Sequence, residues 1–250
     1  MKGFEGNKAV LPLIPEGSPF QGREPIILNI LRSLPPGPRS IIVHHDKETV
    51  MEVTGGMGIA YCHQPVLNGT GGALLAAGDF LRQITSENVI ITMGDIPLVR
   101  PETYRRMEDR LKETPMVVLG FEPADRKQYG ILETNGKQVT RIVEWKYWTN
   151  FARDVLDALR VCNSGIYAVN RETLLFHLDR LASSPHIVRK EIDGRWRQVE
   201  EYFITDLVQI MRKDNIPVGY ILASDEYEVM GVDDVTALET AQRIYRERFL

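Results

Sequence analysis

The chain has 250 residues and a mass of 28.4 kDa, which allows one large domain or two small ones with a sizeable core. Its 43% hydrophobic and 26% charged residues are typical of a folded protein and exclude wholesale disorder. The net charge of −4 disfavours a nucleic-acid partner, because such proteins usually carry a basic surplus that neutralises phosphates. Cys62 and Cys162 are too few for a disulfide framework and favour a reducing compartment.

No segment has the length and apolar character of a membrane span. Residues 53–78 carry no Asp, Glu, Lys or Arg, but Gln64, Pro65 and several glycines interrupt them. The N-terminus, from Met1 to Lys8, lacks the apolar core of a secretory signal. We therefore expect a cytoplasmic protein with no membrane partner.

Apolar runs rich in β-branched residues alternate with amphipathic segments along the chain. Strands are predicted over residues 40–44, 58–62, 88–93, 115–121, 161–169 and 216–222. Helices are predicted over residues 46–53, 70–81, 172–181, 205–213 and 234–249, and another begins at Pro101, where the missing N–H costs nothing. Between residues 131 and 142, two alternating runs flank Asn135-Gly136, a turn pair that accepts positive φ and so indicates a β-hairpin.

Strands separated by helices predict an α/β fold, in which helices flank a mostly parallel, mixed sheet with an inserted β-hairpin. In such a sheet, ligands bind at the carboxyl ends of the strands. The sequence contains neither an internal repeat nor a linker rich in Gly, Ser or Pro. We therefore expect residues 1–250 to form a single domain.

Two predicted strand ends carry residues suited to phosphate chemistry. Gly69–Gly72 precede a predicted helix, where close glycines let the backbone approach a ligand and the helix N-terminus favours an anion. Such turns are common, so this signal alone is weak. Asp95 follows the strand 88–93 and can hold Mg²⁺ on substrate phosphates, although a cap on the turn before a helix explains it equally well.

Two further places carry polar residues. Asp233 and Asp234 precede the last helix, and we expect Asp234 to be its N-cap and Asp233 a metal ligand, although capping alone could explain either residue. Asn163, together with Glu144, offers directional hydrogen bonds that suit sugar hydroxyls. A turn asparagine and a surface glutamate are the plainer interpretation of that pair.

Histidine and cysteine do not indicate a metal site. His44 and His45 are adjacent strand residues that point to opposite faces, and the same holds for Cys62 and His63. No Cys or His pair follows at zinc spacing.

Seven short motifs occur in a fixed order. They are Gln64-x-x-x-x-Gly-Thr-Gly71, Gly94-Asp-x-Pro-Leu98, Tyr129-Gly130, Ile142-Val-Glu-x-Lys146, Asn163-Ser-Gly-Ile-Tyr167, Glu201-Tyr-Phe-Ile-Thr-Asp206 and Gly231-Val-Asp233. In this order the chain resembles the sugar-1-phosphate nucleotidyltransferases, and most of all the uridyltransferase domain of the bifunctional N-acetylglucosamine-1-phosphate uridyltransferases/acetyltransferases. The resemblance runs from about Lys8 to the last helix. It implies a Rossmann-like nucleotidyltransferase fold of the glycosyltransferase-A type.

The resemblance also implies roles for single residues. Gln64 and Gly69 match positions that read the uracil edge, and Thr70 belongs to the same nucleotide-binding loop. The positions that match sugar contacts are Gly130, Glu144, Asn163 and Thr205. Asp95 and Asp233 match the Mg²⁺ ligands, the second of which is Asn in the uridyltransferase, and Lys8 matches a lysine that contacts phosphate. Lys8, Asp95 and Asp233 form the implied catalytic set.

The implied activity is Mg²⁺-dependent transfer of a nucleotidyl group, UMP from UTP, to a sugar 1-phosphate such as N-acetylglucosamine 1-phosphate, with release of pyrophosphate. The implied partners are an NTP and a sugar 1-phosphate. Two alternatives stay open: a related transferase that uses another NTP, such as a guanylyl- or thymidylyltransferase, and a non-catalytic sugar-nucleotide-binding or regulatory protein without the phosphate loop. A Rossmann dehydrogenase is disfavoured, because no Gly-x-Gly-x-x-Gly follows a strand.

The chain departs from the family at its start. The family's first strand and its Leu-Ala-Ala-Gly-x-Gly-x-Arg-Met loop have no match, and Met1 falls near the end of that motif. Loss of a central strand would leave backbone groups of two neighbouring strands unpaired, so we expect the natural protein to begin upstream of Met1. Gly72 replaces a His and Ile131 an Arg of the uridyltransferase.

The chain also departs from the family at its end and in one insertion. It stops at the helix that precedes the acetyltransferase domain, so acetyl transfer is not expected. Residues 184–199 have no counterpart that the resemblance interprets.

Overall fold

A computed structural model describes residues 4–192 and 194–250 of the chain. Its strands are β1 Pro12–Glu16, β2 Ser18–Pro25, β3 Ser40–Val43, β4 Ala60–His63, β5 Asn88–Ile91, β6 Met116–Phe121, β7 Ile131–Asn135, β8 Gln138–Val143, β9 Cys162–Asn170, β10 His186–Ile192, β11 Arg195–Glu201 and β12 Val218–Leu222. Its α-helices are α1 Ile26–Ser33, α2 Lys47–Val53, α3 Gly69–Ala76, α4 Gly78–Gln83, α5 Pro101–Leu111, α6 Trp145–Trp148, α7 Arg153–Ala158, α8 Arg171–Ala182, α9 Asp206–Lys213 and α10 Val235–Phe249. Its 3₁₀ helices are η1 Lys8–Val10 and η2 Glu226–Val229.

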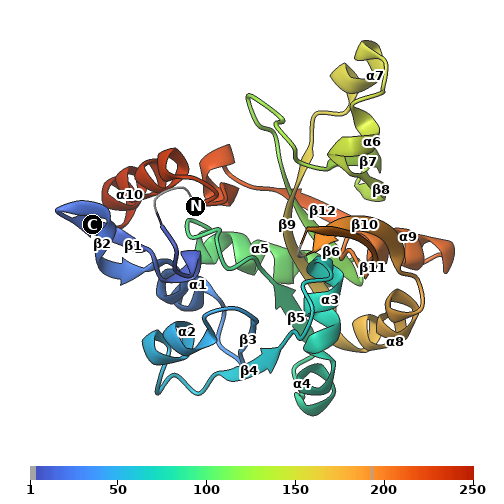
Figure 1. Cartoon of the computed structure of the whole chain (residues 1–250). Helices are drawn as coiled ribbons and strands as arrows, with labels where there is room; N and C mark the ends of the chain where they lie inside the picture. Colours follow the sequence, from blue (N-terminus) through green and yellow to red (C-terminus); the bar gives the residue numbers. More distant parts are fainter. Residues whose placement is uncertain (1–3, 193) are drawn as a thin grey trace.

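Six strands form the central sheet, in the order β5-β9-β6-β12-β8-β7 (Figure 1). β12 pairs with β6 in parallel, whereas β9 runs antiparallel to both β5 and β6, and β8 runs antiparallel to both β12 and β7. β5, β6 and β12 therefore share one direction. The predicted mixed α/β fold with an inserted hairpin is confirmed. Its antiparallel share is larger than the sequence pattern indicated, because β9 lies between β5 and β6.

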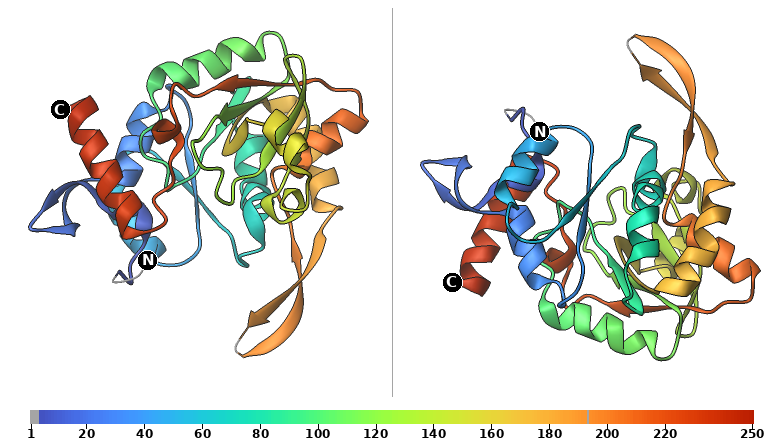
Figure 2. Two further views of the ribbon diagram at one scale, coloured as in Figure 1. Left: turned by 90° about the horizontal axis from the view of Figure 1, so that it is seen from above. Right: turned by 90° about the horizontal axis from the view of Figure 1, so that it is seen from below.

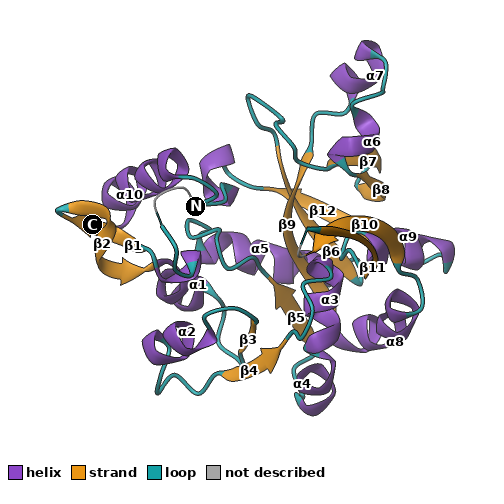
Figure 3. Ribbon diagram, viewed as in Figure 1, coloured by secondary structure: helices purple, strands orange, loops and turns teal. Residues whose placement is uncertain are grey.

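Helices pack on both faces of this sheet (Figure 3). Met116 and Val118 of β6 belong to the core cluster that includes residues of α3, α4, α8 and α9. Val117 and Leu119 belong to the cluster that includes Tyr104 of α5. Successive side chains of a strand alternate between its faces, so β6 supplies both cores. Burial on both faces explains why all six residues of β6 are buried and why its sequence lacks a polar stripe.

A third core joins the two ends of the chain. It contains Leu11 and Leu13 at β1, Ile26 and Ile30 of α1, and Leu98, Val232, Leu238, Ala241, Ile244 and Tyr245 nearer the C-terminus. The buried Gln242 of α10 donates hydrogen bonds to the carbonyl oxygens of Pro12 and Pro19, both at 2.8 Å. The sequence predicted α10, whereas β1, β2 and α1 were not predicted.

The predicted helix over residues 70–81 is divided in two. α3 ends at Ala76 and α4 begins at Gly78, and between them the Ala77 N–H bonds to the Leu74 carbonyl at 3.1 Å, a tighter 3₁₀-type bond. Gly78 is a weak helix former, which favours the break at this point. Across residues 4–192 and 194–250, none of the helices has both the length and the apolar character that a membrane span requires.

The segment that had no interpretation in the sequence forms a two-stranded hairpin, β10–β11. The hairpin extends away from the rest of the molecule (Figure 2). Ile187 and Trp196 are exposed on it. After the hairpin, the chain returns to the sheet at Tyr202, where it meets the glycine-rich loop that follows β4.

Candidate active site

The loop between β4 and α3 is fixed by hydrogen bonds within itself. The buried Gln64 side chain donates from Nε2 to Asn68 Oδ1 at 2.9 Å and to the Gly69 carbonyl at 3.2 Å. Both Nε2 hydrogens are therefore directed into the loop. In this conformation Gln64 can offer a nucleotide base its Oε1 acceptor, so the Gln64 amide shapes the loop in addition to any contact with a ligand.

The glycines of this loop allow a close approach to another backbone segment. Gly69 has φ +91°, and a Cβ there would lie 2.4 Å from the Tyr202 carbonyl oxygen. A Cβ on Gly71 would lie 2.7 Å from the Tyr202 carbonyl carbon, and the Gly71 N–H donates to the Tyr202 carbonyl oxygen at 2.8 Å. Thr70 Oγ1 accepts from the Ile204 N–H at 3.3 Å. The sequence analysis reserved these glycines for a ligand, whereas the structure packs Gly69 and Gly71 against residues 202–204.

A lysine and two aspartates meet beyond the end of β5. Lys8 Nζ lies 3.3 Å from Asp233 Oδ1, and the Val232 N–H donates to the Asp95 carbonyl oxygen at 2.8 Å. Burial raises the pKa of the half-buried Asp95 carboxyl, and the negative charge of Asp233 raises it further, while Lys8 opposes both effects. The structure thus brings together the three predicted catalytic residues, from sequence positions that are far apart.

The neighbouring Asp234 has the role predicted for it. Its Oδ1 accepts from the Ala237 N–H at 2.8 Å and caps the N-terminus of α10. Asp233 is not used for this cap and is largely exposed, with 78% of its side-chain surface accessible. Its carboxylate is therefore available to a ligand at the Asp95 side of the helix end.

The donor set fits a hard divalent cation. Within the described parts of the chain, no cluster of three or more His, Cys, Asp or Glu residues could hold a metal by itself. Asp95 and Asp233 supply oxygen donors, and their mutual repulsion, which raises the pKa of Asp95, is relieved by positive charge. Mg²⁺ commonly binds through one or two carboxylates and completes its shell with substrate phosphates and water. The two aspartates fit that pattern.

The four residues matched to sugar contacts also lie together. Glu144 Oε1 accepts from Thr205 Oγ1 at 3.0 Å, and the Asn163 N–H donates to the Gly130 carbonyl oxygen at 2.8 Å. A Cβ on Gly130 would lie 3.6 Å from Glu144 Oε2, so a glycine leaves room beside the carboxylate. Asn163 Nδ2 donates to the Tyr167 hydroxyl at 2.8 Å, and its Oδ1 accepts from the Gly165 N–H at 3.2 Å.

Backbone segments connect the loop, the acidic pair and this cluster. Ile204 contacts Thr70 while the next residue, Thr205, contacts Glu144. Gly165 has φ +82°, and a Cβ there would lie 3.3 Å from Met93, just after β5. The three groups of predicted residues therefore form one continuous region at the carboxyl end of β5.

Two residues of this region had no predicted role. The hydroxyl of Tyr129 bonds to the Gly231 backbone, and burial followed by the charges of Asp233 and Asp95 raises its pKa. Lys146 Nζ lies 5.0 Å from the ring centroid of Tyr147 and 5.6 Å from that of Phe203. Both residues occur inside the quoted motifs, at Tyr-Gly and Glu-x-Lys, and those motifs were the available sequence signal.

The family model described as "MobA-like NTP transferase domain" matches residues 1–191. The chain belongs to this family. Its curated relatives include bifunctional proteins GlmU. The protein from Ruegeria pomeroyi is 35% identical over 161 residues, which are 64% of this chain and 32% of that protein. The protein from Cereibacter sphaeroides is 31% identical over 232 residues, which are 91% of this chain and 47% of that protein. This NTP transferase domain thus spans less than half the length of these relatives.

Solved structures share the fold of the NTP transferase domain. A putative UDP-N-acetylglucosamine pyrophosphorylase from Entamoeba histolytica superposes with a TM-score of 0.69 at 13% identity, over 98% of this chain and 77% of that one. A putative glucose-1-phosphate thymidylyltransferase from Bacillus anthracis, in complex with a sucrose, gives 0.67 at 16% identity, over 98% and 89%. At this identity the likeness concerns the fold alone. Together with the GlmU relatives, it places the chain among the sugar nucleotidyltransferases.

Proposed function

We propose that the domain transfers UMP from UTP to a sugar 1-phosphate, namely N-acetylglucosamine 1-phosphate, and releases pyrophosphate. The observation that carries the proposal is the pairing of Lys8, Asp95 and Asp233 with the neighbouring Glu144–Thr205 cluster. The first group suits phosphates, because it combines a cation with two oxygen ligands for Mg²⁺. The second suits a neutral sugar ring, because it offers directional hydrogen bonds. The GlmU relatives support this choice of substrates.

The reaction is an in-line displacement at phosphorus. An oxygen of the sugar phosphate bonds to the α-phosphorus, and the bond from that phosphorus to the pyrophosphate oxygen breaks. The incoming phosphate is already anionic, so the domain requires no general base. Mg²⁺ held by Asp95 and Asp233 would supply positive charge to the nucleotide phosphates.

The chain's own residues position the reactants. Lys8 places an ammonium beside Asp233, where it stabilises phosphate charge. Glu144 is held by Thr205, which leaves its second carboxylate oxygen to accept from a sugar hydroxyl. Catalysis in this account consists of orientation and electrostatic stabilisation.

A second candidate differs in the nucleotide base. Both Nε2 hydrogens of Gln64 are used within the loop, so uracil recognition by this amide would rest on Oε1 or on a changed loop conformation. This geometry favours weak discrimination among pyrimidine and purine bases over strict selection of uracil. A transferase that accepts another NTP would use the same phosphate and sugar groups.

The test compares product formation from UTP, dTTP, CTP and GTP, each with N-acetylglucosamine 1-phosphate or glucose 1-phosphate and Mg²⁺. We expect UTP with N-acetylglucosamine 1-phosphate to give the highest kcat/KM. Thr205→Val removes the hydrogen bond to Glu144 and should lower kcat/KM for the sugar phosphate about tenfold, with little change in the KM for UTP. The exposed Thr236→Val is the matched control and should leave both constants unchanged. Binding of the UDP-sugar without turnover of any pair would indicate a non-catalytic binding protein instead.

A further inference from the structure

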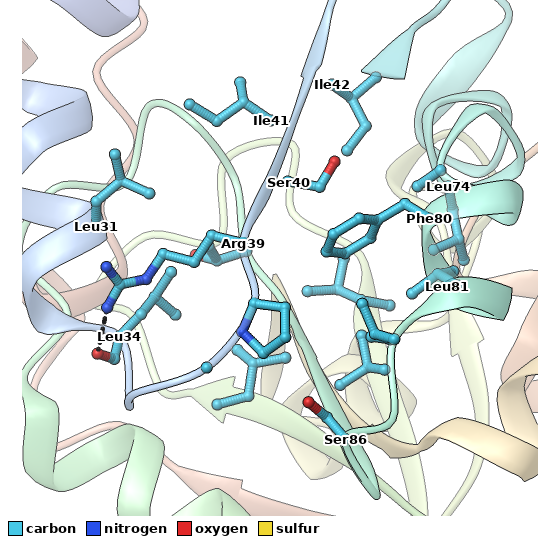
Figure 4. Close-up of a pocket in the computed structure, with 18 of the residues that line it drawn as sticks. Leu31, Leu34, Arg39, Ser40, Ile41, Ile42, Leu74, Phe80, Leu81 and Ser86 are labelled. Carbon is cyan, nitrogen blue, oxygen red and sulfur yellow. Dashed lines mark hydrogen bonds between the residues drawn. The ribbon is translucent and has the colours of Figure 1, made fainter. Parts of the chain in front are cut away.

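An apolar slot separates two strands that each lack a second neighbour. β3 pairs with β4 alone and β5 pairs with β9 alone, among the strands that the structure describes. A cavity of about 580 Å³ lies between them (Figure 4). Its lining includes Ser40–Ile42 of β3, Asn88–Ile91 of β5, Leu74, Phe80 and Leu81 of the helices on one side, and Leu31 of α1 on the other. Two rows of backbone N–H and C=O groups therefore flank the same apolar space.

The strands that flank the slot are apolar but incompletely buried. Ser40-Ile-Ile-Val43 and Asn88-Val-Ile-Ile91 are as rich in β-branched residues as any strand in the chain. Val43 is buried, whereas Ile41, Ile42 and all four residues of β5 are only partly buried. All of β6, by contrast, is buried. Sequences of this kind are typical of central strands covered on both faces and paired on both edges.

Arg39 marks one end of the slot with an unsatisfied donor. Its Nε is buried and has no hydrogen-bond partner, while Nη2 donates weakly to the Leu34 carbonyl at 3.4 Å. Arg39 lines the cavity next to the first residue of β3 (Figure 4). A buried N–H without a partner is costly, so a carbonyl group entering at this end would satisfy it.

We propose that this slot is the docking site of one further β-strand, an extended apolar segment that pairs with β3 on one side and with β5 on the other. Main-chain bonds along both edges would hold it, and small or β-branched side chains would fill the cavity. With β3 and β5 each four residues long, a strand of about four to six residues spans the slot. The added strand joins the β3–β4 pair and the six-stranded sheet into one sheet.

The start of the described chain indicates which segment occupies the slot. The Asn7 N–H donates to Asp46 Oδ2 at 3.2 Å, and its Nδ2 donates to the His45 carbonyl at 3.4 Å, just beyond the carboxyl end of β3. Lys8 reaches Asp233 beside Asp95, beyond the carboxyl end of β5. The first residues thus lie at the exit of the slot, opposite Arg39. The occupant is accordingly polypeptide joined ahead of Met1, running parallel to β3 and β5. This inference does not depend on the proposed function.

The test adds a six-residue Val/Ala/Ile strand ahead of Met1 through a flexible Gly/Ser linker and compares it with the 250-residue chain. We expect amide exchange in β3 and β5 to slow by about tenfold or more and the thermal midpoint to rise. Exchange in the distant β10–β11 hairpin should stay unchanged. A Gly/Ser segment of equal length ahead of Met1, and the apolar strand attached after Leu250, are the matched controls and should have neither effect.

Each other outcome overturns the proposal. Unchanged exchange in β3 and β5 would show that the slot takes no strand. Equal protection from the strand after Leu250 would show nonspecific apolar binding. Protection in the 250-residue chain that grows with protein concentration would identify a second copy as the occupant. None of these readouts depends on catalysis, so failure here and failure of the transferase proposal are distinguishable.

Discussion

Asp95 lies where two unfavourable effects add. Burial raises its pKa above the ordinary value of 3.8, and the charge of Asp233 raises it further, with partial relief from Lys8. A carboxyl whose pKa is raised on folding stabilises the fold while it is protonated, and this stability is lost as pH rises through the folded-state pKa. At neutral pH the ionised Asp95 therefore destabilises the protein, which is the usual cost of a prepared cation site.

We predict that Asp95→Asn raises the thermal midpoint at neutral pH in metal-free buffer. The gain should shrink as the pH falls toward 3.8, where the wild-type carboxyl is protonated as well. Asp233→Asn is the comparison variant, and its effect should be smaller because Asp233 is largely exposed. Thermal unfolding across pH checks this, and a lower midpoint for Asp95→Asn at neutral pH would contradict the electrostatic account.

The two cysteines differ in environment and should differ in reactivity. Cys162 is fully buried at the start of β9, and burial raises the pKa of its thiol to about 11. Cys62 is partly exposed, with its Sγ 3.1 Å from Ser40 Oγ. We predict that a chromogenic disulfide reagent titrates one thiol in the native protein and two in denaturant. Mass spectrometry should assign the native modification to Cys62, and modification of native Cys162 would show that the β6–β9 contact opens readily.

At the scale of elements, the loop before α3 depends on contact between two backbone segments. Gly71 is helical, so Ala would improve helix propensity by about 1 kcal/mol. A Cβ there would nevertheless lie 2.7 Å and 2.8 Å from backbone atoms of Tyr202 and Phe203, which cannot move aside as a side chain can. The steric term therefore decides the sign.

We predict that Gly71→Ala lowers the free energy of unfolding by about 1–3 kcal/mol. Gly78→Ala is the matched control, because the nearest atom to its Cβ is the flexible end of Arg82 at 3.1 Å, so it should be neutral or stabilising. Urea denaturation of both variants checks the contrast. Equal stability of Gly71→Ala and the wild type would mean that residues 202–204 are not held against the loop in solution.

Elements with strong local signals were predicted, and the others were not. The Asn135-Gly136 turn was recognisable because Gly136 must adopt positive φ, here +59°. β1 and β2 were missed because Pro12, Pro15 and Pro19 normally exclude a strand. They are tolerated in a two-stranded ribbon, where each strand has an edge without ladder bonds. The place of β9 between β5 and β6 is a long-range choice that periodicity does not record.

At the scale of the whole molecule, the site exists only where distant segments meet. Lys8 and Asp233 come from opposite ends of the chain and are brought together by the third core, in which α10 packs on β1 and α1. Glu144 and Thr205 meet because the chain returns from the β10–β11 hairpin. Residue types and strand ends indicated Asp95 and Asp233 as candidates, whereas Gly130 and Thr205 were available only from the order of motifs.

The most direct test of the account is pyrophosphate release from UTP and N-acetylglucosamine 1-phosphate, measured with Mg²⁺ and with EDTA. The wild type is compared with Asp95→Ala and with Asp79→Ala, whose side chain is 93% exposed and remote from the site residues in the fold. The account predicts Mg²⁺-dependent release that Asp95→Ala reduces by about 10²-fold or more and that Asp79→Ala leaves unchanged. Release that persists in Asp95→Ala, or that is insensitive to EDTA, would contradict the assignment of Asp95 and Asp233 to the reacting phosphates.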